Sequence, residues 1–211
     1  MKTWDWKRFK GSATALRYAR RDLSTLKRAV SLAVGRSVCV QAGGNLGVFP
    51  KWLAAHFDLV HTFEPSVTVF PLLCHNAPER NIRRHLAALG SEAGSVGTSQ
   101  TRRGTKVGRY AHEGITHVVD GNTAPRVRLD DLNLPACSLI VLDLEGYEGF
   151  ALRGAARTIQ EHRPVLMVEV NGNCRHYGWS SDEVRALITG QGYRMVFRDH
   201  ADEVFVPEER A

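Results

Sequence analysis

The sequence predicts a three-layer α/β/α fold built around a mostly parallel sheet, and three observations support this prediction. From residue 37 onward, short apolar runs alternate with helical stretches, which is typical of βα units. The first run is followed directly by the closely spaced glycines Gly43, Gly44 and Gly47. The chain has 211 residues, of which 43% are hydrophobic and 24% charged, as in globular proteins with one core. We therefore expect one main domain, residues 37–211, preceded by a distinct segment.

That preceding segment, residues 1–36, is a basic arm. It holds ten Lys or Arg residues against Asp5 and Asp22, whereas the whole chain has a net charge of only +6. Six apolar residues recur in it at spacings of three and four, which predicts an amphipathic helix: Leu16, Ala19, Leu23, Leu26, Val30 and Ala33. Two interpretations stay open. The helix packs against its own domain with a solvated basic face, or it binds an anionic partner.

Five apolar runs predict the parallel strands, at 37–42, 59–63, 84–89, 139–142 and 165–170. The stretches between them predict helices over 48–56, 67–76 and 150–162.

The last quarter of the chain adds a helix and a hairpin. Ser180 and Glu183 have the spacing of a capping box, which predicts a helix running from there to Gly190. Residues 193–198 and 203–207 predict two final strands that return as a hairpin. Residues 91–125, rich in Gly, Thr, Ser and Arg, show no lasting periodicity and predict an irregular excursion with one or two short strands.

Cysteine usage and hydropathy exclude several classes of protein. The four cysteines are scattered singly, so the sequence indicates neither a disulfide framework nor a zinc site. No apolar stretch reaches 18 residues and no signal peptide is recognisable, so a cytoplasmic protein is expected. Cys174 and His176 follow the fifth strand and could offer a thiol and an imidazole to a substrate, although this spacing more often has no function.

The glycine turn predicts a nucleoside site when it is combined with Glu64. Closely spaced glycines between a strand and a helix allow backbone N–H groups to approach a ligand. Glu64 closes the next strand 21 residues after Gly43, where a carboxylate can accept hydrogen bonds from both ribose hydroxyls. Asn45 stands where the dinucleotide fingerprint needs its second glycine, so a dehydrogenase is poorly supported.

Four ordered sequence blocks resemble the FkbM-type methyltransferases. They are residues 38–47 with the glycine turn, 63–65 with Glu64, 142–155 with the Asp-Leu-Glu-Gly sequence, and 163–169. The resemblance covers roughly residues 37–171. It implies a Rossmann-like class I methyltransferase with a mostly parallel seven-stranded sheet and an antiparallel C-terminal strand. It also implies that S-adenosylmethionine binds there and that a hydroxyl of a sugar, glycan or other small molecule is O-methylated.

The resemblance further implies which residues contact the cofactor. Glu64 would bind the ribose, and Ala88 and Leu89 after the third strand would lie near the adenine. The remaining cofactor contacts are expected at Gln41, Gly43, Gly44, Asn45, Gly47 and Asp143. Gln41 departs from the family, which commonly has an acidic residue there. A neutral amide can still accept a hydrogen bond from the cofactor ammonium, but without charge assistance.

Three carboxylates are the catalytic candidates. Asp143 and Glu145 follow the fourth strand and Glu169 ends the fifth, and ligands of open α/β sheets bind beyond the C-terminal ends of such strands. Mutual repulsion could raise one pKa and make that group a general base for a hydroxyl acceptor. Alternatively, the carboxylates could together hold a divalent metal ion. For Glu148 the alternative to a catalytic role is an acidic helix N-terminus that complements the helix dipole.

Two other functions remain open at this stage. A nucleic-acid methyltransferase could use the basic arm for salt-dependent phosphate binding, although the fourth strand lacks the Pro-Pro-aromatic motif of enzymes that methylate base amino groups. A non-catalytic adaptor could keep the fold and use the arm to bind a partner. The sequence fixes neither the acceptor nor the oligomeric state.

Overall fold

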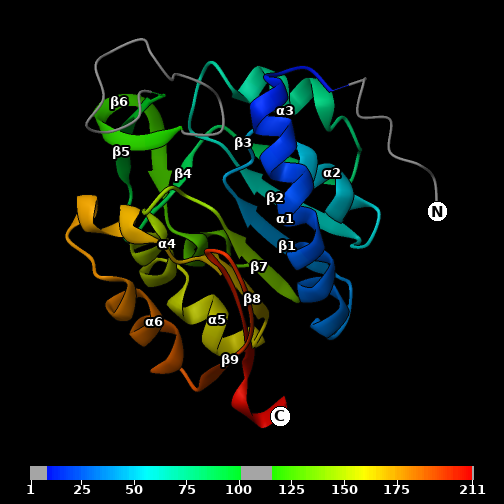
Figure 1. Ribbon diagram of the computed structural model, residues 1–211, viewed down its shortest axis with the longest axis vertical. Coiled ribbons are helices and arrows are strands. Elements are labelled where there is room, and N and C mark those ends of the chain that lie inside the picture. The colour runs from blue at the N-terminus through cyan, green and yellow to red at the C-terminus, as the bar shows by residue number, and fades with distance from the viewer. Residues whose placement is uncertain (1–8, 101–115, 211) are drawn as a thin grey trace.

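A computed structural model of the chain describes residues 9–100 and 116–210. A seven-stranded sheet in the order β3-β2-β1-β7-β8-β10-β9 forms its centre (Figure 1). The strands are β1 Val38–Ala42, β2 Leu59–Phe63, β3 Ile82–His85, β7 Leu139–Leu142, β8 Val165–Glu169, β9 Tyr193–Asp199 and β10 Asp202–Pro207. The first five in this order pair in parallel, and β10 is antiparallel to both β8 and β9. The predicted mostly parallel sheet with an antiparallel C-terminal strand is confirmed.

Helices cover both faces of this sheet. One face packs against α1 Ala13–Leu32, α2 Val48–Ala54 and α3 Phe70–Asn76. The other packs against α4 Glu148–Arg153, α5 Ala156–His162 and α6 Ser181–Thr189. All five residues of β1 are buried, because helices cover both faces of this strand; four of them are apolar and the exception is Gln41. The three-layer arrangement follows from that burial.

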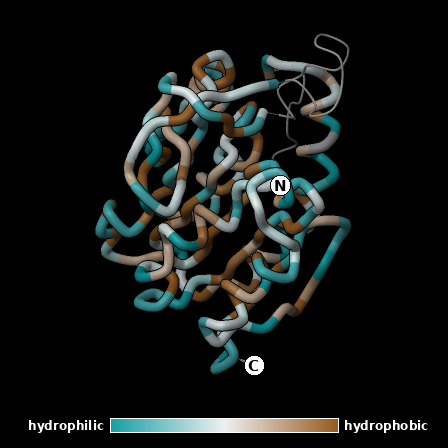
Figure 2. Tube along the Cα trace, turned by 90° about the vertical axis from the view of Figure 1, so that its left-hand side faces the viewer, coloured by the Kyte–Doolittle hydropathy of each residue, from teal (hydrophilic) through white to brown (hydrophobic). Residues whose placement is uncertain are grey.

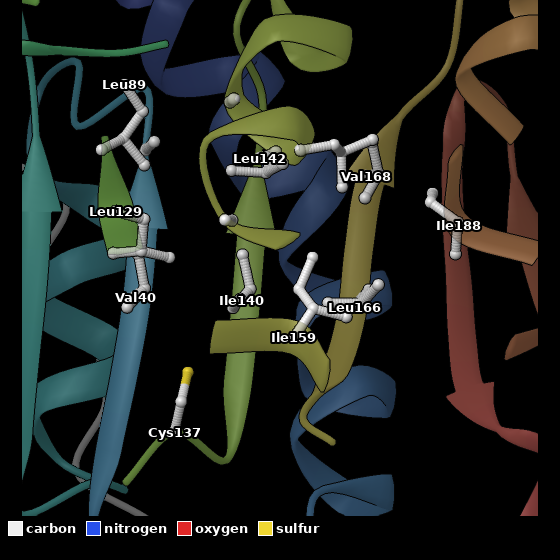
Figure 3. Packing of buried hydrophobic residues seen from close by; sticks show 14 of the residues in the cluster. Val40, Leu89, Leu129, Cys137, Ile140, Leu142, Ile159, Leu166, Val168 and Ile188 are labelled. Carbon is white, nitrogen blue, oxygen red and sulfur yellow. The ribbon is translucent and has the colours of Figure 1, made fainter. Parts of the chain in front are cut away.

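The second of these two interfaces is drawn in Figure 3. Val40, Ile140 and Leu166 lie on the neighbouring strands β1, β7 and β8. Val40 lies next to Leu129, Ile159 of α5 lies by Ile140 and Leu166, and Ile188 of α6 lies near β10. The hydropathy-coloured trace has its apolar segments inside and its polar segments mainly on outer loops (Figure 2). At roughly 25 cal/mol per Å² of apolar surface, this burial is the main favourable term in folding.

α1 is anchored on the sheet by the apolar stripe that the sequence predicts. Ser12 caps the helix, since its Oγ accepts a hydrogen bond from the Ala15 N–H at 3.2 Å. Leu23, Leu26 and Val30 are buried in the same core as the strands. The stripe therefore packs against the chain's own domain, and only the basic face stays exposed for an anionic partner. The division of the chain at residue 36 stays a prediction.

The predicted strand over 84–89 is wrong in its extent. The chain leaves the main sheet after His85, and Ala88–Leu89 forms β4 in a second sheet of order β4-β6-β5. β5 spans Gly94–Ser99 and β6 spans His117–Val127, so β6 is longer than the short strands expected in the excursion. Part of that excursion, residues 101–115, lies outside the described residues.

The predicted helix over 150–162 is in fact two helices, α4 and α5, which meet at Gly154. A Cβ at Gly154 would lie 1.9 Å from the carbonyl oxygen of Gly90, so the backbone of the second sheet's β4 segment passes directly against this break. The predicted capping box of α6 is confirmed. Ser180 Oγ accepts from the Glu183 N–H at 3.1 Å, and Glu183 Oε2 accepts from the Ser180 N–H at 2.7 Å.

In the described part of the chain, short 3₁₀ turns lie at Leu129–Leu132, Gly172–Tyr177 and Glu208–Arg210. Within residues 9–100 and 116–210, no helix is both long and apolar enough to cross a bilayer.

Candidate functional site

The candidate site lies where the strand order of the main sheet reverses, between β1 and β7. Loops leaving the C-terminal ends of these two strands diverge to opposite faces, which opens a crevice in folds of this kind. A pocket that is open to solvent lies at this position, with about 490 Å³ of empty space when the solvent at its mouth is included. Its lining comes from α1, the glycine turn, the start of α2 and the end of β7: Ala15, Ala19, Asp22, Gly43, Gly44, Asn45, Leu46, Val48, Phe49 and Asp143.

The glycine turn is held tightly between β2 and β7. The N–H groups of Gly43 and Gly44 both donate to the carbonyl oxygen of Phe63, at 3.0 and 2.8 Å. Gly43 has φ +85°, and a Cβ on it would lie 1.9 Å from the carbonyl oxygen of Asp143. Only glycine satisfies both the backbone angle and the close approach. The turn therefore lies directly against the end of β7.

Gln41 holds this turn from inside the sheet. Its side chain is fully buried, with Nε2 donating to the Gly43 carbonyl at 2.8 Å and Oε1 accepting from Thr62 Oγ1 at 2.6 Å. Gln41 is also absent from the pocket lining. The amide that the resemblance would assign to the cofactor is thus engaged in the turn.

Glu64 lies beneath the other end of the turn. Its Oε2 accepts from the Asn45 N–H and its Oε1 from the Ser66 N–H, both at 2.9 Å. Burial raises the pKa of Glu64 to about 7, although both N–H groups favour the carboxylate and oppose this shift. The carboxylate is 3% exposed, so in this conformation it supports the turn next to the predicted ribose position.

Asn45 offers an acceptor that nothing in the described chain satisfies. Its backbone is left-handed, with φ +44°, and its Oδ1 is buried with no hydrogen-bond partner among the described residues. Leaving a buried polar atom without a partner costs about 1–3 kcal/mol. Because Asn45 lines the pocket, this atom is a candidate acceptor for a ligand donor.

Asp143 and Glu169 form an acidic pair at the ends of β7 and β8. Burial raises the pKa of Asp143 to about 6; the charge of Asp22 adds to this shift, and a hydrogen bond with Glu169 opposes it. Burial followed by repulsion from Asp143 and Glu148 raises the pKa of Glu169 well above its usual range. Glu169 therefore holds a proton more readily than an ordinary glutamate, and the hydrogen bond between the two side chains favours the ionised form of Asp143. The pocket thus holds Asp143 ionised and more basic than an ordinary aspartate.

The other two acidic residues after β7 have partners of their own. Glu148 is 2% exposed, and its Oε1 accepts from the N–H groups of Leu144 at 2.7 Å and Gly146 at 3.3 Å. It therefore shapes the loop before α4, and the predicted interaction with the helix dipole stays a prediction. Glu145 has φ +54° and its Oε2 accepts from Asn173 Nδ2 at 2.9 Å.

The remaining candidates lie away from the pocket lining. Ala88 and Leu89, expected near the adenine, are 3% and 1% exposed in β4 of the second sheet. Gly47 starts α2 with φ +82°, and its missing Cβ leaves room for Leu73. Cys174 is buried and its Sγ donates to the Asn171 carbonyl at 3.0 Å, whereas His176 is exposed.

The structure also brings in three residues that sequence reasoning missed. Ala15, Ala19 and Asp22 of α1 line the pocket, since steps of four and three residues place them on one side of a helix. The same spacing was visible in the sequence, but nothing in it connects that side with the glycine turn. In the part of the chain that the structure describes, no group of three or more His, Cys, Asp or Glu is arranged to hold a metal ion.

The family model described as "Methyltransferase FkbM domain" matches residues 18–195 of this chain. The match begins within α1 and extends beyond the 37–171 range of the resemblance.

Solved structures show the same fold at low sequence identity. The methyltransferase FkbM from Methylobacillus flagellatus KT is 16% identical, with a TM-score of 0.53, and the match covers 95% of this chain and 56% of that one. The N-methyltransferase NodS from Bradyrhizobium japonicum WM9, in complex with S-adenosyl-L-homocysteine, is 13% identical with a TM-score of 0.50, covering 97% and 91%. The precorrin-6y C5,15-methyltransferase from Geobacter metallireducens GS-15 is 10% identical with a TM-score of 0.52, covering 96% and 93%.

A comparison of the sequence with curated proteins finds no match. The chain spans little more than half the length of the Methylobacillus protein.

Proposed function

Because this chain belongs to the FkbM methyltransferase family, we propose that it transfers a methyl group from S-adenosylmethionine to a hydroxyl of a sugar, glycan or other small molecule. The observation that carries this proposal is the pocket at the β1/β7 reversal. It combines a glycine turn, an unpartnered Asn45 Oδ1 and two carboxylates, Asp22 and Asp143. A single site with these groups suits a ligand that is both a nucleoside and a cation.

The residues of the pocket fit the cofactor in chemistry. When bound, S-adenosylmethionine supplies a methyl group on a positively charged sulfonium. Gly43 and Gly44 line the pocket with backbone alone, and Asn45 Oδ1 can accept a hydrogen bond from a donor such as a ribose hydroxyl. Asp22 and Asp143 provide negative charge where the positively charged part of the ligand would lie. The structural relative NodS, which was solved with S-adenosyl-L-homocysteine, supports the same class of ligand.

We assign the general base to Asp143. A hydroxyl acceptor must lose a proton during transfer, and a base is most effective when its pKa lies near the working pH. The pKa of Asp143 rises to about 6, which leaves it ionised at pH 7 and still able to accept a proton. Glu169 acts as a positioning residue that donates a hydrogen bond to Asp143. Glu145, held by Asn173, is the second candidate for contact with the acceptor.

A base accounts for the acidic pair better than a metal does. Burial raises the pKa of Glu169 well above its usual range, so a divalent cation would have to displace a proton that is held more tightly than on an ordinary glutamate. We therefore propose transfer without a bound metal ion.

The test is methyl transfer from radiolabelled S-adenosylmethionine into a fractionated lysate, with the Asp143→Asn variant beside the wild type. We expect label in glycan or small molecules with the wild type and a loss of at least a hundredfold in the variant. Asp131→Asn is the matched control, because Asp131 is an exposed aspartate on the Leu129–Leu132 turn.

Each other result selects a different function. Label found only in nucleic acid would favour a nucleic-acid methyltransferase. Cofactor binding without transfer to any fraction would favour the non-catalytic adaptor. Absence of both binding and transfer would reject methyltransferase activity altogether.

A further inference from the structure

One wall of the pocket is a helix whose role the family resemblance leaves open. Ala15, Ala19 and Asp22 of α1 face the glycine turn and Asp143 across the pocket. The two alanine side chains are small and apolar, so Asp22 is the polar side chain that this helix contributes to the lining. In Figure 1, α1 runs alongside β1 and α2, in agreement with its packing against α2 and β8.

The two ends of the glycine turn have different neighbours. Asn45 lies over Glu64, because its N–H donates to Glu64 Oε2 at 2.9 Å. Gly43 lies against the backbone of Asp143, and Asp22 is close enough to Asp143 to raise its pKa. A ligand whose ribose lies by Glu64 would therefore extend its other end toward Asp143 and Asp22.

That other end of S-adenosylmethionine carries an ammonium group, which needs a negative partner when it leaves water. Gln41, near the end of β1, cannot serve, since its side chain is neutral, fully buried and hydrogen-bonded to Thr62 and the Gly43 carbonyl. Asp143 is already hydrogen-bonded to Glu169. Asp22 is the second carboxylate of the pocket lining, and its side chain is 18% exposed.

We propose that Asp22 is a cofactor-binding residue, whose carboxylate pairs with the ammonium group of S-adenosylmethionine and replaces the charge that Gln41 lacks. This inference rests on the proposed function. Arg21 Nε contacts Asp22 Oδ1 at 2.5 Å, so we assign the ammonium to Oδ2.

The position of Asp22 is fixed from both sides along the chain. After it, Leu23, Leu26 and Val30 anchor α1 in the core. Before it, the backbone of Lys10 is tied to α3: its N–H donates to Asn76 Oδ1 at 2.8 Å and its carbonyl accepts from Asn76 Nδ2 at 2.7 Å.

Asn76 also links this segment to the turn, because its Nδ2 donates to the carbonyl of Leu46 at 2.9 Å. The helix and the turn are thus connected through one buried side chain. A carboxylate held in this way loses little conformational entropy when it binds its partner.

The experiment compares two ligands by isothermal titration calorimetry. S-adenosylhomocysteine carries the ammonium group, whereas 5′-methylthioadenosine has the same nucleoside and a thioether sulfur but no amino-acid part. For Asp22→Asn we expect roughly tenfold or greater weakening of S-adenosylhomocysteine binding, as for loss of a charge-assisted hydrogen bond. Binding of 5′-methylthioadenosine should stay within about twofold of the wild type, since it lacks the group that Asp22 contacts.

Two further variants control the measurement. Asp22→Glu keeps the charge and should restore most of the affinity for S-adenosylhomocysteine. Asp58→Asn removes an exposed carboxylate just before β2. It lies at the N-terminal ends of the parallel strands, whereas the pocket lies at their C-terminal ends, so the affinity for both ligands should stay unchanged.

The outcomes separate this inference from the proposed function. If the wild type binds both ligands and Asp22→Asn weakens neither, or weakens both equally, the ammonium contact is wrong and the proposed function stands. If the wild type binds neither ligand, the proposed function fails and this inference fails with it.

Discussion

Replacing Gly43 by alanine tests whether the glycine turn is held by contact with the end of β7. The substitution should lower the free energy of unfolding for two separate reasons. Gly43 has φ +85°, and a left-handed backbone costs a residue with a Cβ about 1–2 kcal/mol. The added Cβ would also lie 1.9 Å from the Asp143 carbonyl oxygen, so β1 and β7 would have to shift, and overpacking of this kind costs roughly 1–3 kcal/mol.

Two other glycines separate these costs. Gly178 has φ +79° and open space where its Cβ would lie, so Gly178→Ala reports the backbone cost alone, about 1–2 kcal/mol. Gly172 has open space and no left-handed φ, so Gly172→Ala should change stability little or raise it by about 0.4–1 kcal/mol. The two costs sum to roughly 2–5 kcal/mol for Gly43→Ala.

Urea unfolding of the three variants and the wild type provides the assay, with binding of S-adenosylhomocysteine measured alongside. We expect Gly43→Ala to be the least stable and to lose binding, whereas both control variants keep it. If Gly43→Ala is no less stable than Gly178→Ala and binds normally, the close approach of the turn to Asp143 does not exist in solution.

Three further predictions concern the groups around the site. Burial, reinforced by Asp143 and Asp22, raises the pKa of Asp202 to about 8, so the folded state keeps a proton that the unfolded state releases. The free energy of unfolding should therefore fall as the pH rises from about 4 to about 8. In urea unfolding, Asp202→Asn should show a weaker dependence of this free energy on pH than the wild type. The same dependence in both proteins would mean that Asp202 titrates normally. Arg185 binds the fully buried Glu203 through Nε and Nη2, at 3.0 and 2.8 Å. Arg185→Met should therefore lower the free energy of unfolding, measured by chemical denaturation, by about 2–4 kcal/mol. A decrease below about 0.5 kcal/mol would contradict the pairing. Asp130 Oδ1 accepts hydrogen bonds from the Thr158 N–H and hydroxyl, both at 2.8 Å. Asp130→Ala should therefore lower the free energy of unfolding by about 2 kcal/mol and leave the ligand affinity unchanged. A loss of affinity would mean that the start of α5 affects the pocket.

The central strands could be predicted from the sequence because they are buried on both faces. β2 and β7 begin and end at the predicted residues, and β1 and β8 differ by one. β7 is apolar throughout, and β1 and β8 carry one polar residue each, Gln41 and Glu169, so these short runs have few alternatives between two helical layers. The position of the glycine turn and of Asp143 followed from these strands. Four of the ten residues that line the pocket, Gly43, Gly44, Asn45 and Asp143, are among the predicted site residues.

The errors arise where long-range contacts decide the structure. Nothing local separates His85 from Ala88, yet the chain passes from one sheet to another between them. Gly154 interrupts the expected helix because the carbonyl of Gly90 lies against it, 64 residues earlier in the chain. From the sequence Asp22 is only one of two acidic residues in the basic arm, because its closeness to the glycine turn depends on how α1 packs.

The role of Gln41 shows the same limit. The sequence shows that an acidic residue is missing at this position, but not where the amide points. Its contacts with Thr62 and the Gly43 carbonyl depend on the pairing of β1 with β2. Residues that a pattern assigns to a ligand can thus be engaged within the protein itself.

Hydrogen–deuterium exchange with and without S-adenosylhomocysteine tests the central claim most directly, because it locates the bound ligand in the chain. We predict slower exchange in peptides that contain residues 43–47 and in those from the first half of α1, with little change in the Ala156–His162 helix on the far side of the sheet. Binding that protects other segments and leaves residues 43–47 unchanged would contradict the assignment of this pocket to the cofactor.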